Sequence, residues 1–195
     1  MTTNTRFARA TWTALVAGLV VLGTMAVLTL GAGPTDAGSE PDPISPRMLT
    51  DRHEFTDDVA AQLRIKPDRR PREVMNLRDA SNLAVVEITV QPGARFPWHT
   101  HPGPVLVAVT AGELIYVYGD DCVERPYPEG KAFVDPGGDN VHTAFNPSED
   151  DETVVIATFL DAPDEGDLTV PVEQATQEEL DQRCGMEAGS PPHDH

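Results

Sequence analysis

The chain has 195 residues, enough for one ordinary domain with extensions, and its 39% hydrophobic and 24% charged residues are typical of a globular protein. Its 14 Lys and Arg against 32 Asp and Glu leave a formal net charge of −18. This charge argues against negatively charged partners such as nucleic acid or anionic lipid. The 18 prolines and 15 glycines favour short strands and turns over long helices.

The first 32 residues have the pattern of an export signal or a membrane anchor. Arg6 and Arg9 are the only charged side chains before an apolar run of 19 residues, 12–30. A positive flank before such a run predicts that the N-terminus stays in the cytoplasm and that the rest is exported. The run matches the roughly 20 residues of a membrane span and exceeds the roughly 7–15 of a signal-peptide core. We therefore expect a single span in the cell membrane with the domain outside the cytoplasm, and a secreted protein if the segment is cleaved.

Residues 33–50 are expected to form a linker, because the segment is polar and rich in proline. The domain is expected at 51–185, with its most regular part at 83–160. Beyond it, residues 186–195 are expected to be a disordered tail.

Helical signals are few. Residues 56–63 are compatible with a short helix capped by Thr56, which two prolines soon interrupt. Residues 178–183 are compatible with a helical turn. Neither segment is long enough to suggest a helical layer.

From residue 83 the pattern changes to short strands rich in β-branched residues and separated by turns. At least six are expected, at 83–90, 105–110, 113–118, 131–134, 141–145 and 153–160. No helix-length segment separates them, so the spacing predicts an all-β sandwich or barrel rather than βαβ units.

Three histidines are the candidate site residues. His99 and His101 are two apart, so in an extended segment both imidazoles lie on one face. His142 follows a corner rich in glycine and proline, at 135–140. Two histidines from one strand and one from another can form an open-sided site for a divalent metal ion.

These residues resemble the two sequence motifs of the cupin superfamily. The first motif is Gly93, five residues, His99, one residue, His101, and then Gly112 at the end of the segment. The second is Gly130, five residues, Pro136, one residue, Gly138, His142, three residues and Asn146. The resemblance covers roughly 83–160 and implies a single cupin-type β-barrel, a double-stranded β-helix sandwich. It implies much less about function, because the superfamily includes enzymes, storage proteins and sensors.

The chain departs from the cupin pattern at the carboxylate ligand. Cupins usually place a metal-binding Glu four or five residues after the second histidine, where this chain has Val105 and Leu106. The resemblance therefore implies a site of three histidines with no protein carboxylate. Such a site leaves a divalent ion its full charge of +2, which favours an anionic or chelating ligand. One smaller departure is an extra residue between Gly138 and His142.

Two functions are compatible with this resemblance. Some cupin dioxygenases bind Fe(II) through three histidines, so the first is an Fe(II)-dependent oxygenase acting on a small anionic substrate, with Zn, Mn or Ni as other candidate metals. The second is a non-catalytic module that binds or senses a small ligand in the same barrel. The sequence identifies no catalytic residue, and it leaves open whether two barrels pair as a homodimer.

Cys122 and Cys184 are the only cysteines. In an exported chain two thiols meet an oxidising compartment, where they usually pair. We therefore expect a disulfide that ties the C-terminal segment to the barrel.

Overall fold

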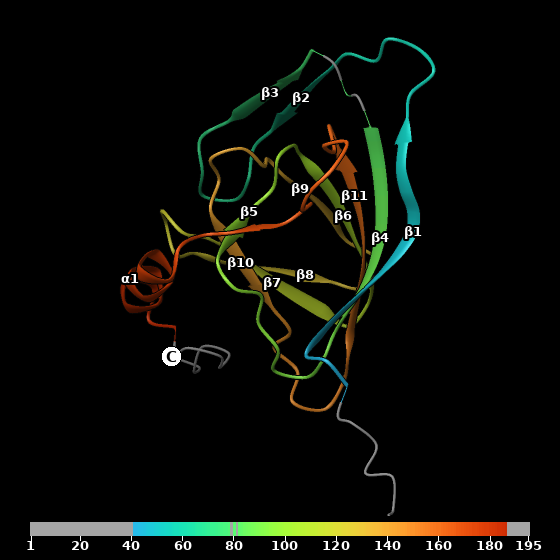
Figure 1. Cartoon of the computed structure of the whole chain (residues 1–195). Coiled ribbons are helices and arrows are strands. Elements are labelled where there is room, and N and C mark those ends of the chain that lie inside the picture. Colours follow the sequence, from blue (N-terminus) through green and yellow to red (C-terminus); the bar gives the residue numbers. More distant parts are fainter. Residues whose placement is uncertain (1–40, 79, 81, 187–195) are drawn as a thin grey trace, which may run out of the picture. The chain divides into compact units, whose positions relative to one another are not determined.

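The computed structural model describes residues 41–78, 80 and 82–186, and the statements below concern these residues. Two five-stranded antiparallel sheets pack face to face (Figure 1). The first sheet consists, in spatial order, of β1 (Ile44–Glu54), β4 (Asn82–Val90), β11 (Thr153–Leu160), β6 (Val105–Ala111) and β9 (Ala132–Asp135). The second consists of β12 (Val170–Pro171), β5 (His99–Thr100), β10 (His142–Phe145), β7 (Glu113–Tyr118) and β8 (Glu124–Pro128).

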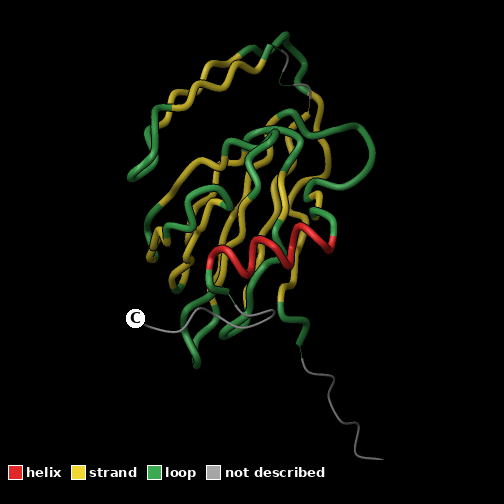
Figure 2. The backbone as a smooth tube through the Cα atoms, turned by 90° about the vertical axis from the view of Figure 1, so that its left-hand side faces the viewer, coloured by secondary structure: helices red, strands yellow, loops and turns green. Residues whose placement is uncertain are grey.

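Two further elements lie outside the sandwich. A separate hairpin is formed by β2 (Ala61–Ile65) and β3 (Glu73–Leu77). The single described helix, α1 (Gln174–Cys184), lies across the strands on one face of the barrel (Figure 2). It covers the outer face of the second sheet.

The alternation of side chains along the strands explains this layered arrangement. In β11 every second residue, from Thr153 to Phe159, is buried between the sheets, which is the period of a pleated strand. In β7 the alternate residues Tyr116 and Tyr118 enter the same core, whereas Val117 faces the second core beneath α1. A strand buried on both faces needs apolar residues at nearly every position, as β7 has.

Helix α1 is held to the barrel by polar contacts as well as by apolar packing. Gln177 makes two hydrogen bonds to the backbone of Trp98: its Oε1 accepts from Trp98 N at 2.8 Å and its Nε2 donates to Trp98 O at 2.7 Å. The Trp98 indole N–H donates to Asp181 at 2.7 Å. At the end of the helix a disulfide joins Cys184 to Cys122, with Cα atoms 5.1 Å apart, as the sequence predicted. The helix therefore braces the residue that immediately precedes His99.

The predicted β-sandwich is confirmed, and all six predicted strands are present with ends within two residues of those expected. Strand β8 was not predicted, because Pro126 and Pro128 lie within it. It is an edge strand of its sheet, where proline is tolerated since half of the backbone groups need no partner.

Two predictions before residue 83 were wrong. Residues 44–50 belong to β1, the edge strand that pairs with β4, and not to a linker. The proposed helix at 56–63 is also absent, since residues 61–65 form β2 and pair with β3. In both places pairing with another strand, distant in the chain for β1 and the next strand for β2, outweighs local composition.

The predicted export helix at 1–32, the first part of the linker and tail residues 187–195 lie outside the described residues. Within the described part of the chain, no helix is long and apolar enough to cross a membrane.

Candidate metal centre

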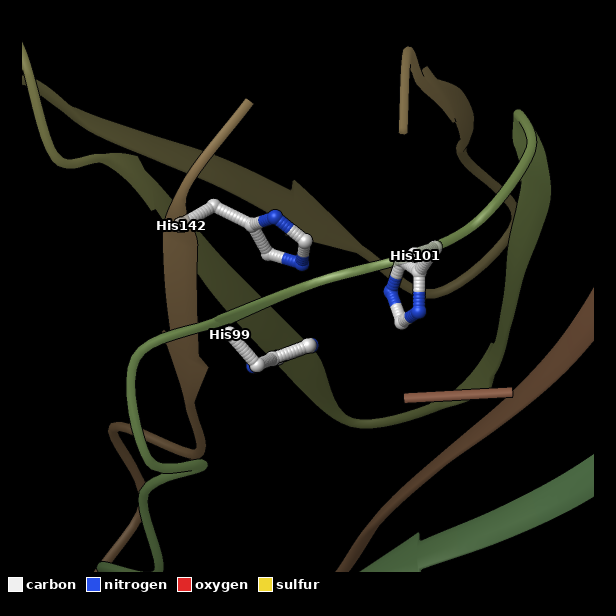
Figure 3. A group of neighbouring side chains, drawn as sticks. All are labelled: His99, His101 and His142. Carbon is white, nitrogen blue, oxygen red and sulfur yellow. The ribbon is translucent and has the colours of Figure 1, made fainter. Parts of the chain in front are cut away.

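The strand register brings the three predicted histidines together. His142, the first residue of β10, pairs directly with His99 of β5, and side chains of directly opposed residues lie on the same face of a sheet. His101 follows β5 one step further along. All three are buried, with 5%, 7% and 2% of their surface exposed for His99, His101 and His142. Figure 3 shows the three rings gathered beside one another, and one ring nitrogen of each lies within 4.8 Å of the others.

A backbone carbonyl orients each ring. The Nδ1 atom lies 2.7 Å from Pro97 O in His99, 2.8 Å from Leu168 O in His101 and 3.2 Å from Asn140 O in His142. Since a carbonyl only accepts, each Nδ1 carries a proton, and in a neutral ring the lone pair is then on Nε2. Metal-binding histidines are commonly oriented in this way.

Burial favours the neutral form of two of the imidazoles, those of His99 and His101. Desolvation, with a smaller contribution from the neighbouring His142 and His101, lowers the pKa of His99 from 6.5 to about 3. Desolvation also lowers the pKa of His101, although the nearby Asp135 charge opposes the shift. Both rings are therefore in the unprotonated form that binds a metal at neutral pH, and His99 remains so well below it.

A buried carboxylate, Asp135, also reaches this group. Its Oδ2 atom lies 2.8 Å from His142 Nε2 and 3.6 Å from His101 Nε2, and only 1% of the residue is exposed. Burial by itself would raise its pKa, but the charge and hydrogen bond of His142, with His101 and the Gly137 N–H, lower it to about 2. The three predicted histidines form the candidate metal-binding group, and a protein carboxylate that the sequence analysis did not foresee lies beside them.

The sequence reasoning missed Asp135 because it looked for the acid only at the position where cupins usually carry it. A signal was present: Asp135 directly follows the predicted strand at 131–134 and lies two residues after Phe133, hence on the same face if the strand continues.

The histidines and Asp135 are among the residues that line a cavity of about 60 Å³. Most of the other lining residues are apolar, including Phe96, Phe133 and Phe159. Tyr116 also lines the cavity, and its ring stacks on His142 with centroids 4.8 Å apart and planes at 21°.

The Tyr116 hydroxyl is buried in the cavity lining and makes no hydrogen bond of good geometry among the described residues, although the Asp135 carboxylate lies close to it. Burial, reinforced by the nearby Asp135 charge, raises its pKa well above 10, so it remains a donor. A buried hydroxyl without a good hydrogen bond is costly and is typical of a group that serves a ligand.

A family model described as "Cupin domain" matches residues 86–159, the segment that contains all four site residues. The barrel is a cupin domain. The resemblance recognised from the two histidine motifs is thereby confirmed. A search of curated proteins found no match to this sequence.

Several solved structures are similar to this cupin chain at low identity. A conserved protein of unknown function from Streptococcus pyogenes is 16% identical, with 65% of this chain and 80% of that chain covered and a TM-score of 0.42. A cupin-like protein from Thermotoga maritima is 24% identical over 50% and 72% of the two chains, with a TM-score of 0.40. KdgF from Halomonas sp. is 19% identical over 63% and 82%, with a TM-score of 0.41. We draw no function from these neighbours.

Proposed function

We propose that this chain is an extracytoplasmic metal-dependent oxygenase, which holds Fe(II) through His99, His101 and His142 and acts on a small molecule inside the cupin barrel. The orientation of the three imidazoles carries the proposal. Each ring has its Nδ1 engaged by a carbonyl, so the three Nε2 atoms face a common space. Neutral imidazoles in that arrangement are a ligand set for a first-row divalent ion.

Iron is the metal we favour, and Zn, Mn or Ni would also suit these ligands. A ferrous ion held here would supply the redox chemistry that dioxygen requires. The chain's own contribution is to fix the three rings and to surround them with apolar side chains. Phe96, Phe133 and Phe159 exclude bulk water from the reacting centre.

The polar groups of the cavity bear on the substrate. Tyr116 offers a neutral hydroxyl donor that makes no hydrogen bond of good geometry, with the Asp135 carboxylate as a nearby acceptor. None of the described residues that line the cavity is Lys or Arg, and Asp135 adds a negative charge. The preference for an anionic substrate rested on a site without a carboxylate, so we replace it with a small uncharged substrate that accepts a hydrogen bond from Tyr116.

Two features support a location outside the cytoplasm. Arg6 and Arg9 precede the apolar run at 12–30, the pattern of an exported chain. The Cys122–Cys184 disulfide suits an oxidising compartment.

The size of the cavity favours a second candidate function, a non-catalytic module that senses a metal or a very small ligand. About 60 Å³ accommodates only a few water molecules, whereas sites for drug-sized ligands are typically about 300–1,000 Å³. An oxygenase would need a substrate that fits this space or displaces side chains at its edge.

Metal analysis of the full chain, purified without a polyhistidine tag, tests the proposal. We expect one metal per chain and loss of stoichiometric metal in His99→Ala, because two histidines are too few for a tight site. Oxygen uptake by the Fe(II) form with small uncharged candidates would then separate the oxygenase from the sensor. If the unmodified protein binds no metal at neutral pH, or if His99→Ala keeps one tight metal, the proposal is wrong.

A further inference from the structure

The geometry points to Asp135 as a fourth protein ligand of the metal, one that takes the place of the glutamate cupins usually carry on the adjacent strand. The inference rests on the proposed metal site and adds a ligand that reduces the charge of a bound divalent ion from +2 to +1. Three observations support it: the distances from its carboxylate, the strand register and the way its side chain is held.

The distances fit a shared ion. Ligand atoms that each lie about 2.0–2.2 Å from one ion, at angles of roughly 90–110°, are separated by roughly 2.8–3.6 Å. Asp135 Oδ2 lies 2.8 Å from Nε2 of His142 and 3.6 Å from Nε2 of His101, which matches that range. In His142 the proton on Nδ1 faces Asn140 O, so Nε2 and the carboxylate oxygen oppose each other as two acceptors unless a cation lies between them. A proton or a metal ion can serve as that cation.

The strand register explains how the carboxylate comes to be there. Val105 stands at the position where cupins usually have the ligand glutamate, four residues after His101. Strands β6 and β9 pair so that Val105 and Asp135 are directly opposite, and both line the cavity. Side chains opposite each other in an antiparallel pair are about 4.5–5.5 Å apart at Cβ. The acid therefore lies on the strand opposite the usual glutamate position and still faces the histidines.

The Asp135 side chain is held in this orientation by the turn that follows it. Its Oδ1 atom accepts a hydrogen bond from Gly137 N at 2.7 Å, which leaves Oδ2 to face the imidazoles. Gly137 has a φ of +65°, and a Cβ there would lie 2.1 Å from Gly103 O, so the turn packs against the segment between β5 and β6. A ligand fixed in this way needs little rearrangement to bind an ion.

Asp135→Asn is the direct test, since Asn retains an oxygen for Gly137 N and removes the charge. We expect Co(II) affinity, measured against a competing chelator on the full chain, to fall by about 100-fold or more, because loss of even an outer-shell partner costs about 10–100-fold. Asp139→Asn is the matched control: it removes the same charge from an exposed position in the same turn and should leave affinity unchanged. The Val105→Glu, Asp135→Asn double variant should recover most of the loss.

A structural role for Asp135 predicts the opposite result. If the carboxylate only pairs with a protonated His142, Asp135→Asn removes a competitor for the metal, and affinity stays the same or rises. That outcome, with one metal on the unmodified chain, overturns this inference and leaves the three-histidine site intact. Absence of metal from the unmodified chain overturns both.

Asp135→Glu provides a second measurement in case the Asn variant does not fold. It keeps the charge but lengthens the side chain, so the Co(II) absorption spectrum should change while metal is retained. An unchanged spectrum would mean that the carboxylate does not touch the ion.

Discussion

The Cys122–Cys184 disulfide should contribute a large share of the stability of this domain. The bridge closes a loop with a sequence separation of 62 residues. For that loop length the chain-entropy relation gives about 4 kcal/mol at 25 °C, at the upper end of the common range of about 2–4 kcal/mol. We expect the Cys122→Ser, Cys184→Ser double variant to lose roughly this much free energy of unfolding.

Guanidinium unfolding of the metal-free full chain, with and without the substitutions, measures the effect. Because the cross-link acts mainly on the unfolded chain, the slope of the free energy against denaturant should rise in the variant as more surface becomes exposed. Reduction of the unmodified protein should reproduce the same shift. A loss below about 1 kcal/mol would refute the reasoning. So would a loss seen in only one of the two proteins, the double Ser variant or the reduced unmodified chain.

Removal of the disulfide should also weaken metal binding. Helix α1 buries Leu180 and holds Trp98 through Gln177 and Asp181, and Trp98 immediately precedes His99. Without the bridge at its end, the helix should dock less firmly, and metal affinity should fall by about 10-fold, the lower end for outer-shell changes. Unchanged affinity would mean that polar contacts alone fix the helix.

Three other outcomes follow from the structure. Tyr116→Phe removes a hydroxyl that makes no hydrogen bond of good geometry, so the free energy of unfolding from a thermal melt should change by less than about 1 kcal/mol. The affinity for a small hydrogen-bond acceptor should fall several-fold. A clear loss of stability would show instead that the hydroxyl has a structural role. Because the pKa of His99 falls from 6.5 to about 3 on folding, the unfolded chain binds the proton that the folded chain excludes. The apoprotein should thus lose about 1.4 kcal/mol per pH unit from pH 6.5 down to 4, and a flat profile in urea unfolding would contradict the shift. If residues 12–30 anchor the chain, the protein should remain with membranes after a carbonate wash, whereas a soluble mature chain beginning near Gly38 would show cleavage.

Local patterns in the sequence were sufficient for the β-sandwich and for the three histidines. Strands such as 113–118 and 153–160 carry their own signal, because side chains alternate between faces with a period of two. The histidines were found for a related reason: residues 99 and 101 share a face whichever partner the strand pairs with.

The elements that local patterns missed depend on a pairing partner, which is distant in the chain for β1 and the preceding strand for β8. Strand β1 looks like a linker in composition and becomes a strand because it pairs with β4. The edge strand β8 includes prolines that only an edge position tolerates. In each case pairing supplies the energy that local preference lacks.

The residues of the candidate site also divide into those that the sequence identified and those that only the tertiary structure identified. The sequence by itself determined which residues could bind a metal and that a glutamate was missing beside His101. Only the tertiary structure placed Asp135 beside the histidines, because the register of β6 with β9 sets which residue faces Val105. It also decided that Tyr116 is buried beside His142 without a hydrogen bond of good geometry. Register and burial depend on contacts between residues far apart in the chain, and a pattern of neighbours along the sequence does not contain them.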